Sequence, residues 1–257
     1  MKFKDHYDEA CARLLAEKFA AVYAPVERRR FVGLIAGRVA DKELFERLDV
    51  FARALEACLP DDCAETIALF EQILGPPLKG ERGMYTEGWW LWPLSRYVER
   101  HGSACVARSL QFIRQLTMRF SGEFAIRPIL AHDPRAGVSA MVRWSRDPNV
   151  HVRRLASEGM RIRLPWAKKQ YTALENFADY KTILGNLKAD DSRFVQKSVG
   201  NNLNDLFKEA PEKAAEIIRE WQAEPLPPAT LWILRHGTRT VRRTPPLGLP
   251  PPRYSYQ

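Results

Sequence analysis

The sequence predicts an all-α protein, and three observations support this fold class. Apolar residues recur at helical spacing through most of the 257-residue chain, whereas no convincing run alternates polar and apolar residues as a β-strand does. A segment in the second half recurs after 43 residues, an interval typical of stacked helical units. The hydrophobic content of 46% is enough for a packed core and excludes an intrinsically disordered chain.

The first half of the chain is expected to contain six amphipathic helices. They are predicted over residues 9–24, 27–39, 41–59, 60–74, 89–100 and 103–120. Pro25 ends the first helix, and Asp41 is expected to act as the N-cap of the third. Pro60 and the aspartates after it are expected to start the fourth helix. The segment Gly75–Gly88 is rich in glycine and proline and is predicted to be a loop.

The repeat is visible when residues 146–156 are aligned with residues 189–199. The matched positions are Asp147 with Asp190, Val152 with Val195, Arg154 with Lys197, and Ala156 with Val199. Each copy begins with an aspartate that can cap a helix and then places a valine, a basic residue and a small residue on the second helix of an α-hairpin. This pattern and period predict HEAT-type repeats, which bury their apolar faces by stacking into a curved solenoid. Residues Arg114 to Pro128 are expected to form an earlier, degenerate unit.

The C-terminal end differs in composition from the rest. Eight of the 18 prolines lie between Pro225 and Pro252. Residues Leu231 to Arg235 are expected to form a last short helix, and the chain from Thr244 onward is expected to be extended and poorly ordered. The predicted organisation is therefore a helical-repeat domain over residues 1–236, followed by a Pro/Arg-rich tail over residues 237–257.

The net charge of +9 is concentrated in two segments. Residues 135–170 carry nine Arg and Lys against two acidic residues, and residues 235–257 carry five Arg and no acidic residue. A basic excess confined in this way predicts a surface that binds a polyanion. A solvated basic face without a partner is the alternative.

Several classes of protein are disfavoured by what the sequence lacks. No apolar run approaches the roughly 20 residues of a membrane-spanning helix, and the N-terminus has no apolar signal core. The cysteines and histidines have neither C-x-x-C nor H-E-x-x-H spacing, so we expect no metal and no cofactor. Cys11, Cys58 and Cys105 lie among apolar residues and are expected to be free core thiols in a reducing compartment.

Three blocks of sequence carry a resemblance to a known family. They are SGEFAIRPIL (Ser121–Leu130), WSRDPNVHVRRLASEGMRIRLPWA (Trp144–Ala167) and SVGNNLNDLFKEAP (Ser198–Pro211). Together with the repeats they resemble the AlkC branch of the AlkC/AlkD DNA glycosylases, over roughly Lys4 to His236. Some AlkC-like proteins carry an immunoglobulin-like domain after the helical part, and we expect this chain to be the short form without one.

The resemblance implies a superhelix that cradles double-stranded DNA on its concave face. It also implies a monofunctional DNA-3-methyladenine glycosylase of base excision repair, which excises cationic N3-alkylated bases, chiefly 3-methyladenine and 3-methylcytosine, without full base flipping. Such a base leaves as a neutral molecule while positive charge moves to the sugar. Carboxylates near C1′ and a positioned water are then the groups that help. A monomer in the cytoplasm, associated with the nucleoid, is expected.

Four residues in the matched blocks are implied to be catalytic. Glu158 and Asp205, 47 residues apart, are expected to flank the sugar, with Glu123 as a third carboxylate. Trp166 follows a helix break and could place its ring against the sugar or the charged base.

Each of these residues also has a purely structural interpretation. Glu158 could pair within its own helix with Arg154 or Arg161, and Trp166 could fill the core. Asp205 could be a surface acid near Lys208. Glu123 could satisfy a helix N-terminus or pair with Arg127.

A further set of basic and amide side chains is expected to bind DNA phosphates. These are Arg146, Arg153, Arg154, Arg161, Arg163, Lys168, Lys169, Asn201 and Asn202. Two alternatives remain at this point: a non-catalytic module that binds DNA, and a helical scaffold for an acidic protein partner.

Overall fold

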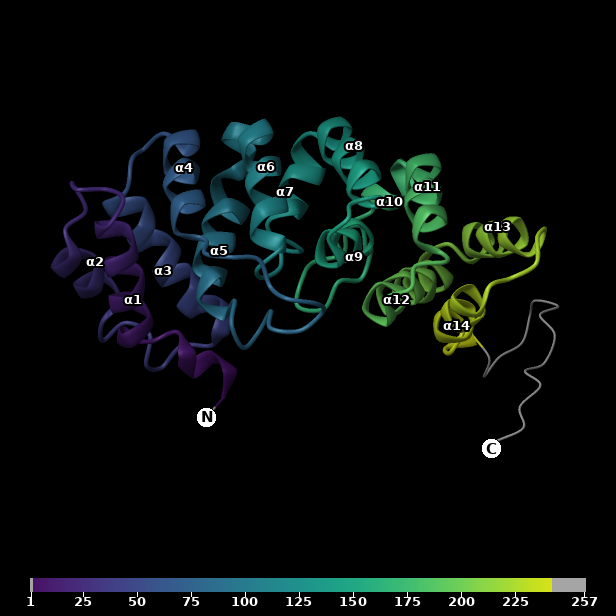
Figure 1. Ribbon diagram of the computed structural model, residues 1–257, viewed down its shortest axis with the longest axis horizontal. Coiled ribbons are helices and arrows are strands. Elements are labelled where there is room, and N and C mark those ends of the chain that lie inside the picture. Colours follow the sequence, from purple (N-terminus) through teal and green to yellow (C-terminus); the bar gives the residue numbers. More distant parts are fainter. Residues whose placement is uncertain (1, 242–257) are drawn as a thin grey trace.

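The computed structural model describes residues 2–241, which form a curved stack of helices (Figure 1). The elements are η1 (Phe3–His6), α1 (Glu9–Ala20), α2 (Arg28–Ile35), α3 (Leu44–Cys58), α4 (Cys63–Ile73), η2 (Trp89–Leu91), α5 (Trp92–His101), η3 (Gly102–Cys105), α6 (Val106–Thr117), α7 (Ile126–His132), α8 (Pro134–Trp144), α9 (Val150–Glu158), α10 (Thr172–Glu175), α11 (Phe177–Leu187), α12 (Arg193–Glu209), α13 (Pro211–Gln222) and α14 (Pro228–Gly237). Residues 2–241 contain no strand, and the all-α helical-repeat fold is confirmed.

The helices form two layers. Figure 1 shows α4, α6, α8, α11 and α13 along the upper edge and α3, α5, α9, α12 and α14 along the lower edge. Within the lower layer α12 packs between α9 and α14, and α3 packs against α5. Two loops, residues 75–88 and 159–171, lie below the lower layer between α5 and α9 (Figure 1).

The 43-residue repeat corresponds to the pairs α8/α9 and α11/α12. Val152 and Val195 are fully buried at equivalent positions of α9 and α12. The repeat aspartates do not act as the caps, because Asn149 and Ser192 do so. Each aspartate instead accepts a hydrogen bond from the backbone N–H of the capping residue, at 2.9 Å in both repeats.

Those same aspartates join neighbouring units. Asp147 pairs with Arg114 of α6 and Asp190 pairs with Arg153 of α9, each with an N···O distance of 2.6 Å. The aspartates therefore hold the turn before each inner helix and also tie it to the unit before.

Three predicted boundaries were wrong. The N-cap of α3 is Glu43, which forms a capping box with Glu46, so Asp41 lies outside the helix. Pro128 does not end a unit: it lies in the first turn of α7, where its missing N–H costs nothing. The last helix is longer than expected, and the tail predicted from Thr244 lies outside the described residues.

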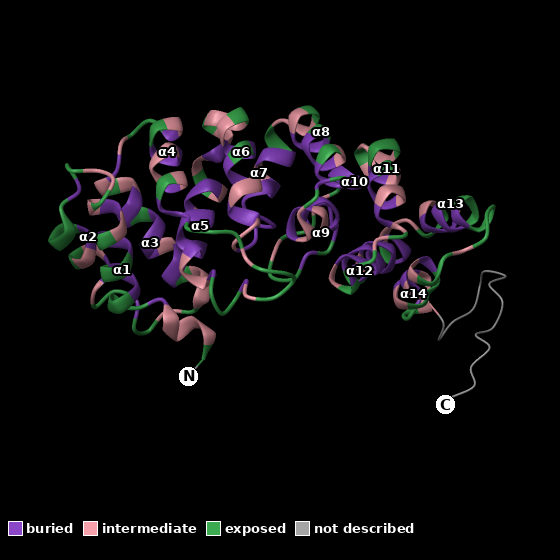
Figure 2. Ribbon diagram, in the orientation of Figure 1, coloured by how far each residue is buried: buried purple, intermediate pink, exposed green. Residues whose placement is uncertain are grey.

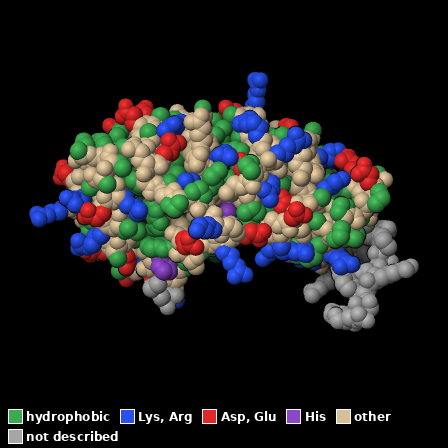
Figure 3. Space-filling view, viewed as in Figure 1, with side chains coloured by type: hydrophobic (Ala, Val, Ile, Leu, Met, Phe, Trp, Pro, Cys, Tyr) green, Lys and Arg blue, Asp and Glu red, His purple; other side chains and the backbone are tan. Residues whose placement is uncertain are grey.

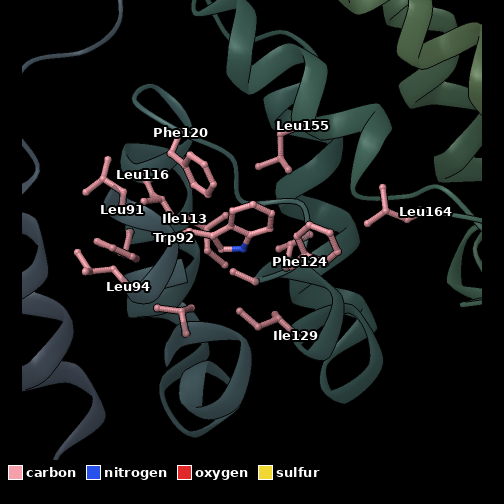
Figure 4. Packing of buried hydrophobic residues seen from close by; sticks show 14 of the residues in the cluster. Leu91, Trp92, Leu94, Ile113, Leu116, Phe120, Phe124, Ile129, Leu155 and Leu164 are labelled. Atoms are coloured by element: carbon pink, nitrogen blue, oxygen red, sulfur yellow. The ribbon is translucent and has the colours of Figure 1, made fainter. Parts of the chain in front are cut away.

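The core runs along the whole stack. Figure 2 shows buried residues on the sides of the helices that face one another and exposed residues at their outer ends. At its centre Trp92 packs among apolar side chains from α5, α6, α7 and α9, and its ring stacks on Phe124 with 5.9 Å between centroids (Figure 4). The segment that holds Glu123 is therefore attached directly to the core.

The cysteines differ from the prediction. Cys63 at the start of α4 and Cys105 before α6 form a disulfide, with Cα atoms 6.0 Å apart, so Cys105 is not a free thiol. Cys11 and Cys58 are free. Among residues 2–241 no helix is long and apolar enough to cross a membrane.

Candidate functional site

The loop after α9 is held in a closed shape by one buried arginine. Arg127 of α7 donates from Nη1 to the carbonyl of Arg161 at 2.9 Å and from Nη2 to the carbonyl of Lys168 at 2.7 Å. The N–H of Gln170 closes the loop on the carbonyl of Ile162 at 3.2 Å. The two ends of the loop are thus fixed to one side chain, and Arg127 is not the partner of Glu123.

Trp166 is displayed at the tip of this loop. The residue is 73% exposed, and its ring makes a T-shaped contact with that of Phe45, with 6.4 Å between ring centroids. Its φ of 63° lies in the left-handed region, which is unfavourable for a bulky residue and typical of functional positions. Core filling, the structural alternative for this residue, is therefore wrong.

Beside the loop, three carboxylates and two arginines alternate in one buried network. We call this set, Glu123, Arg154, Glu158, Arg161 and Asp205, the carboxylate network. Arg154 Nη1 lies 2.6 Å from Glu123 Oε2, and its Nη2 lies 3.3 Å from Glu158 Oε1. Arg161 bridges onward, from Nη1 to Glu158 Oε1 at 3.0 Å and from Nε to Asp205 Oδ2 at 2.9 Å. The formal charge of the network is −1.

The predicted pair of acids is brought together by the repeat geometry. Glu158 at the end of α9 and Asp205 in α12 both contact Arg161, and both are buried. The pairing of Glu158 with Arg154 within α9 is confirmed, whereas Arg161, which also pairs with Glu158, lies in the loop after the helix. Asp205 is not a surface acid near Lys208.

Glu158 is held as an anion in spite of its burial. Burial raises the pKa of Glu158, but the charges of Arg154 and Arg161 and a hydrogen bond from Ser198 outweigh it, so the net shift is downward. Ser198 Oγ donates to Glu158 Oε2 at 2.6 Å and lies 2.7 Å from Ser157 Oγ. Both oxygens of Glu158 are therefore engaged.

The three carboxylates differ in how much acceptor capacity remains. Asp205 accepts at both oxygens, since Arg161 Nη2 reaches Oδ1 at 3.3 Å and the backbone N–H of Arg163 reaches Oδ2 at 3.3 Å. Glu123 Oε2 is occupied by Arg154, whereas no described residue donates to Glu123 Oε1. Glu123 is thus the carboxylate with an oxygen available to a ligand or water.

The second loop brings an aromatic residue to the network. His151 Nε2 lies 2.8 Å from the carbonyl of Gly80, which ties the loop to α9. Tyr85 of this loop is 43% exposed and packs edge-on to Phe3 and Phe120. Burial of its hydroxyl and the nearby charge of Glu123 raise the pKa of Tyr85 to about 12, so the phenol keeps its proton.

Several residues expected to bind phosphates have internal partners. Arg154 and Arg161 belong to the carboxylate network, and Arg153 forms a two-point ion pair with Asp190. Asn202 is fully buried and donates to the carbonyls of residues 157 and 198. These four side chains hold the repeats together, and their donors are used within the protein.

The other members of that set lie at the surface. Arg163 and Lys169 converge on Glu209 at 2.6 and 2.8 Å, and their hydrogen bonds lower the pKa of Glu209 to about 2. Arg146 donates to Asn186 at 3.1 Å. Lys168 is exposed, and Asn201 is half-buried. Figure 3 shows Lys and Arg side chains along the lower edge of the molecule, on the side of these loops.

Sequence reasoning missed three residues of the site. Ser198 is a buried residue that aligns with Leu155 in the preceding repeat. A polar residue at a position that is apolar in the other repeat was the feature of the sequence that could have identified it. Arg127 and Tyr85 gave no signal, because their roles depend on loops that meet only in the fold. Residues 2–241 contain no group of His, Cys, Asp and Glu side chains able to hold a metal ion.

Comparison with known proteins gives concordant matches. Residues 121–238 match the DNA alkylation repair enzyme family, and this stretch includes the whole carboxylate network. Uncharacterized protein YhaZ of Bacillus subtilis (strain 168) is 32% identical over 241 residues, which are 93% of this chain and 64% of that protein. The Pseudomonas fluorescens alkylpurine DNA glycosylase AlkC, bound to DNA containing an abasic site analog, matches with a TM-score of 0.81 and 32% identity. That match covers 94% of this chain and 65% of AlkC.

The chain thus spans less than two thirds of the length of both relatives. Taken together, these findings show that residues 121–238 match the DNA alkylation repair enzyme family and that the helical-repeat fold is similar to that of AlkC.

Proposed function

We propose that this protein is a monofunctional DNA glycosylase that hydrolyses the N-glycosidic bond of cationic N3-alkylated bases, 3-methyladenine and 3-methylcytosine, in double-stranded DNA. The observation that carries the proposal is the carboxylate network, which has a net negative charge and whose Arg161 lies in the same loop as the exposed Trp166. AlkC, to which the chain is similar, was solved with DNA that contains an abasic site analog.

The network suits the charge movement of this reaction. When the C1′–N bond breaks, its electron pair goes to the base, which leaves neutral, and positive charge develops on the sugar. Negative charge held near C1′ stabilises that state, and it acts more strongly in a site that excludes water. Water then attacks C1′ and gives its proton to a carboxylate.

The hydrogen bonding of the network supports a division of roles. Glu123 has a free oxygen and is assigned to positioning and deprotonating the water. Glu158 and Asp205, whose oxygens are all engaged, supply fixed negative charge, and Arg154 and Arg161 hold them in place. Trp166 would place its ring on the sugar or on the charged base.

The substrate base is proposed to stay largely within the duplex. Two hollows of about 450 and 560 Å³ lie at the surface, near Val50 and near Leu110, and neither is lined by a residue of the carboxylate network. The network itself is buried beside the loop of residues 159–171, which contains Arg161. These features favour approach to the lesion from the backbone, with Arg146, Arg163, Lys168, Lys169 and Asn201 near phosphates.

Release of alkylated bases tests the proposal. Duplex DNA treated with N-methyl-N-nitrosourea is incubated with the protein, and free 3-methyladenine and 3-methylcytosine are separated by chromatography. The wild type is expected to release both, leaving abasic sites without strand cleavage, while Glu158→Gln and Asp205→Asn release little. Salt-sensitive binding without release would support a non-catalytic DNA-binding module instead.

A further inference from the structure

A row of basic and amide side chains follows one face of α12. Arg193, Lys197 and Asn201 are spaced four residues apart, so they lie along one side of the helix. At 100° per residue, Lys197 and Asn201 lie about 80° and 40° round the helix from Asp205. The row is therefore adjacent to the stripe that carries Ser198 and Asp205 of the site.

Helix α14 adds a second row beside the first. The ring of His236 stacks on that of Trp232, with 4.9 Å between centroids and an interplanar angle of 8°. The guanidinium of Arg193 lies over the other aromatic ring of this pair, 4.1 Å from the Trp232 centroid. His236 Nε2 and Arg239 Nη2 each lie 3.0 Å from Asn201 Oδ1. The two helices thus share one connected polar surface.

We call this set, Arg193, Lys197, Asn201, Trp232, His236 and Arg239, the α12–α14 surface. Within residues 2–241 no carboxylate forms an ion pair with the cations of this surface, which are Arg193, Lys197 and Arg239. Both bonds to Asn201 use its carbonyl oxygen, so its amide N–H groups remain available as donors.

The titration of His236 agrees with a strongly positive environment. Burial and the charges of Arg239, Lys197 and Arg161 lower the pKa of His236 to about 4. The ring is therefore neutral at pH 7. Since the amide oxygen of Asn201 can only accept, Nε2 carries the hydrogen, which fixes the orientation of the ring.

We propose that the α12–α14 surface binds adjacent phosphates of the DNA backbone next to the lesion. Lys197 and Arg239 would neutralise the phosphates, Asn201 would donate a hydrogen bond, and the Trp232–His236 stack would keep the cations in position. This inference rests on the proposed function only in taking duplex DNA as the ligand. It explains how DNA is held when Arg153, Arg154 and Arg161 have their donors engaged within the protein.

The salt dependence of binding to an undamaged duplex tests this proposal. Each phosphate neutralised contributes about −0.9 to the slope of log K against log salt concentration. The slope of Lys197→Gln/Arg239→Gln, measured by fluorescence anisotropy, is expected to be shallower than that of the wild type by about 2. Lys197→Arg/Arg239→Lys, which keeps both charges, is expected to retain the wild-type slope.

A matched control separates this surface from net charge. Arg135→Gln/Arg219→Gln removes two exposed arginines from α8 and α13 of the other layer and is expected to leave the slope unchanged. Equal slopes for the two Gln variants would overturn the proposal. Excision by the wild type, measured separately, distinguishes that failure from a failure of the proposed function.

Discussion

Glu123→Gln removes one charge from the site and leaves its shape in place. The glutamine carbonyl can still accept from Arg154 Nη1, which lies 2.6 Å from Glu123 Oε2 in the wild type. Arg154 also keeps its contact with Glu158 at 3.3 Å. The formal charge of the carboxylate network rises from −1 to 0, and the base that would receive the proton of water is lost.

The magnitude follows from these two losses. A carboxylate about 4 Å from a unit positive charge contributes about 4 kcal/mol at an effective dielectric constant of about 20. That energy corresponds to a rate factor of about 10³. General-base catalysis by itself contributes about 10² to 10⁴. We therefore expect excision to slow by about 10³ or more, while the free energy of unfolding changes by less than about 1.5 kcal/mol.

Single-turnover release of 3-methyladenine from methylated duplex measures the rate, and urea unfolding measures the stability. Binding of an undamaged duplex is expected to stay equal or become tighter, since a negative charge has been removed near phosphate. Glu224→Gln, at an exposed position remote from the network, is the charge-matched control. If Glu123→Gln excised the base at a rate within threefold of the wild type, as is expected of the control Glu224→Gln, the assignment of Glu123 as the general base would be refuted.

Four further outcomes are expected. Arg161→Met leaves the buried Asp205 without an ion pair and lowers the free energy of unfolding by about 3–5 kcal/mol in urea melts. Trp166→Gly relieves the left-handed backbone, so it raises that free energy by about 1 kcal/mol yet slows excision. The pKa of Glu158 in the folded protein lies below its ordinary value, so its contribution to stability is complete above about pH 4.3 and is lost on acidification. We therefore expect Glu158→Gln to flatten the fall in the free energy of unfolding between about pH 5 and about pH 3. Reduction of the Cys63–Cys105 disulfide, whose cysteines are 42 residues apart, is expected to lower the free energy of unfolding by about 3–4 kcal/mol. In Cys63→Ser the free energy of unfolding is expected to be the same with and without reductant.

The helical layers could be predicted because their pattern is local and repeated. Val152 and Val195 fall at the same position of two units, and both are fully buried. The caps could not be assigned with the same accuracy. Asp41 and Glu43 are both acidic residues just before a helix, and only the capping box with Glu46 decides between them. The Cys63–Cys105 disulfide depends on the packing of α4 beside α6, which no local spacing encodes.

At the site, the sequence indicated which acids lie together but not what the arginines do. The repeat put Glu158 and Asp205 on one surface, and Arg161 joins them there. In the net charge calculated from the sequence, Arg153 and Lys197 each contribute one positive charge and cannot be distinguished. In the fold Arg153 is paired with Asp190 and Lys197 is exposed without an acidic partner among the described residues. Partner choice is a property of the packed helices, so it could not be read from composition.

The charge of the network also constrains where the substrate lies. Negative charge attracts a cationic base before the reaction and a cationic sugar during it, but only attraction that grows towards the transition state accelerates cleavage. Glu123, with its free oxygen, therefore has to lie nearer the sugar than the base if the proposed function holds. Fixing the carboxylates with arginines provides this charge without reorganisation at the moment of reaction. A neutral base would gain little from the same site because it would depart as an anion, so under the proposed function selection for cationic bases follows from the leaving group and needs no enclosing pocket.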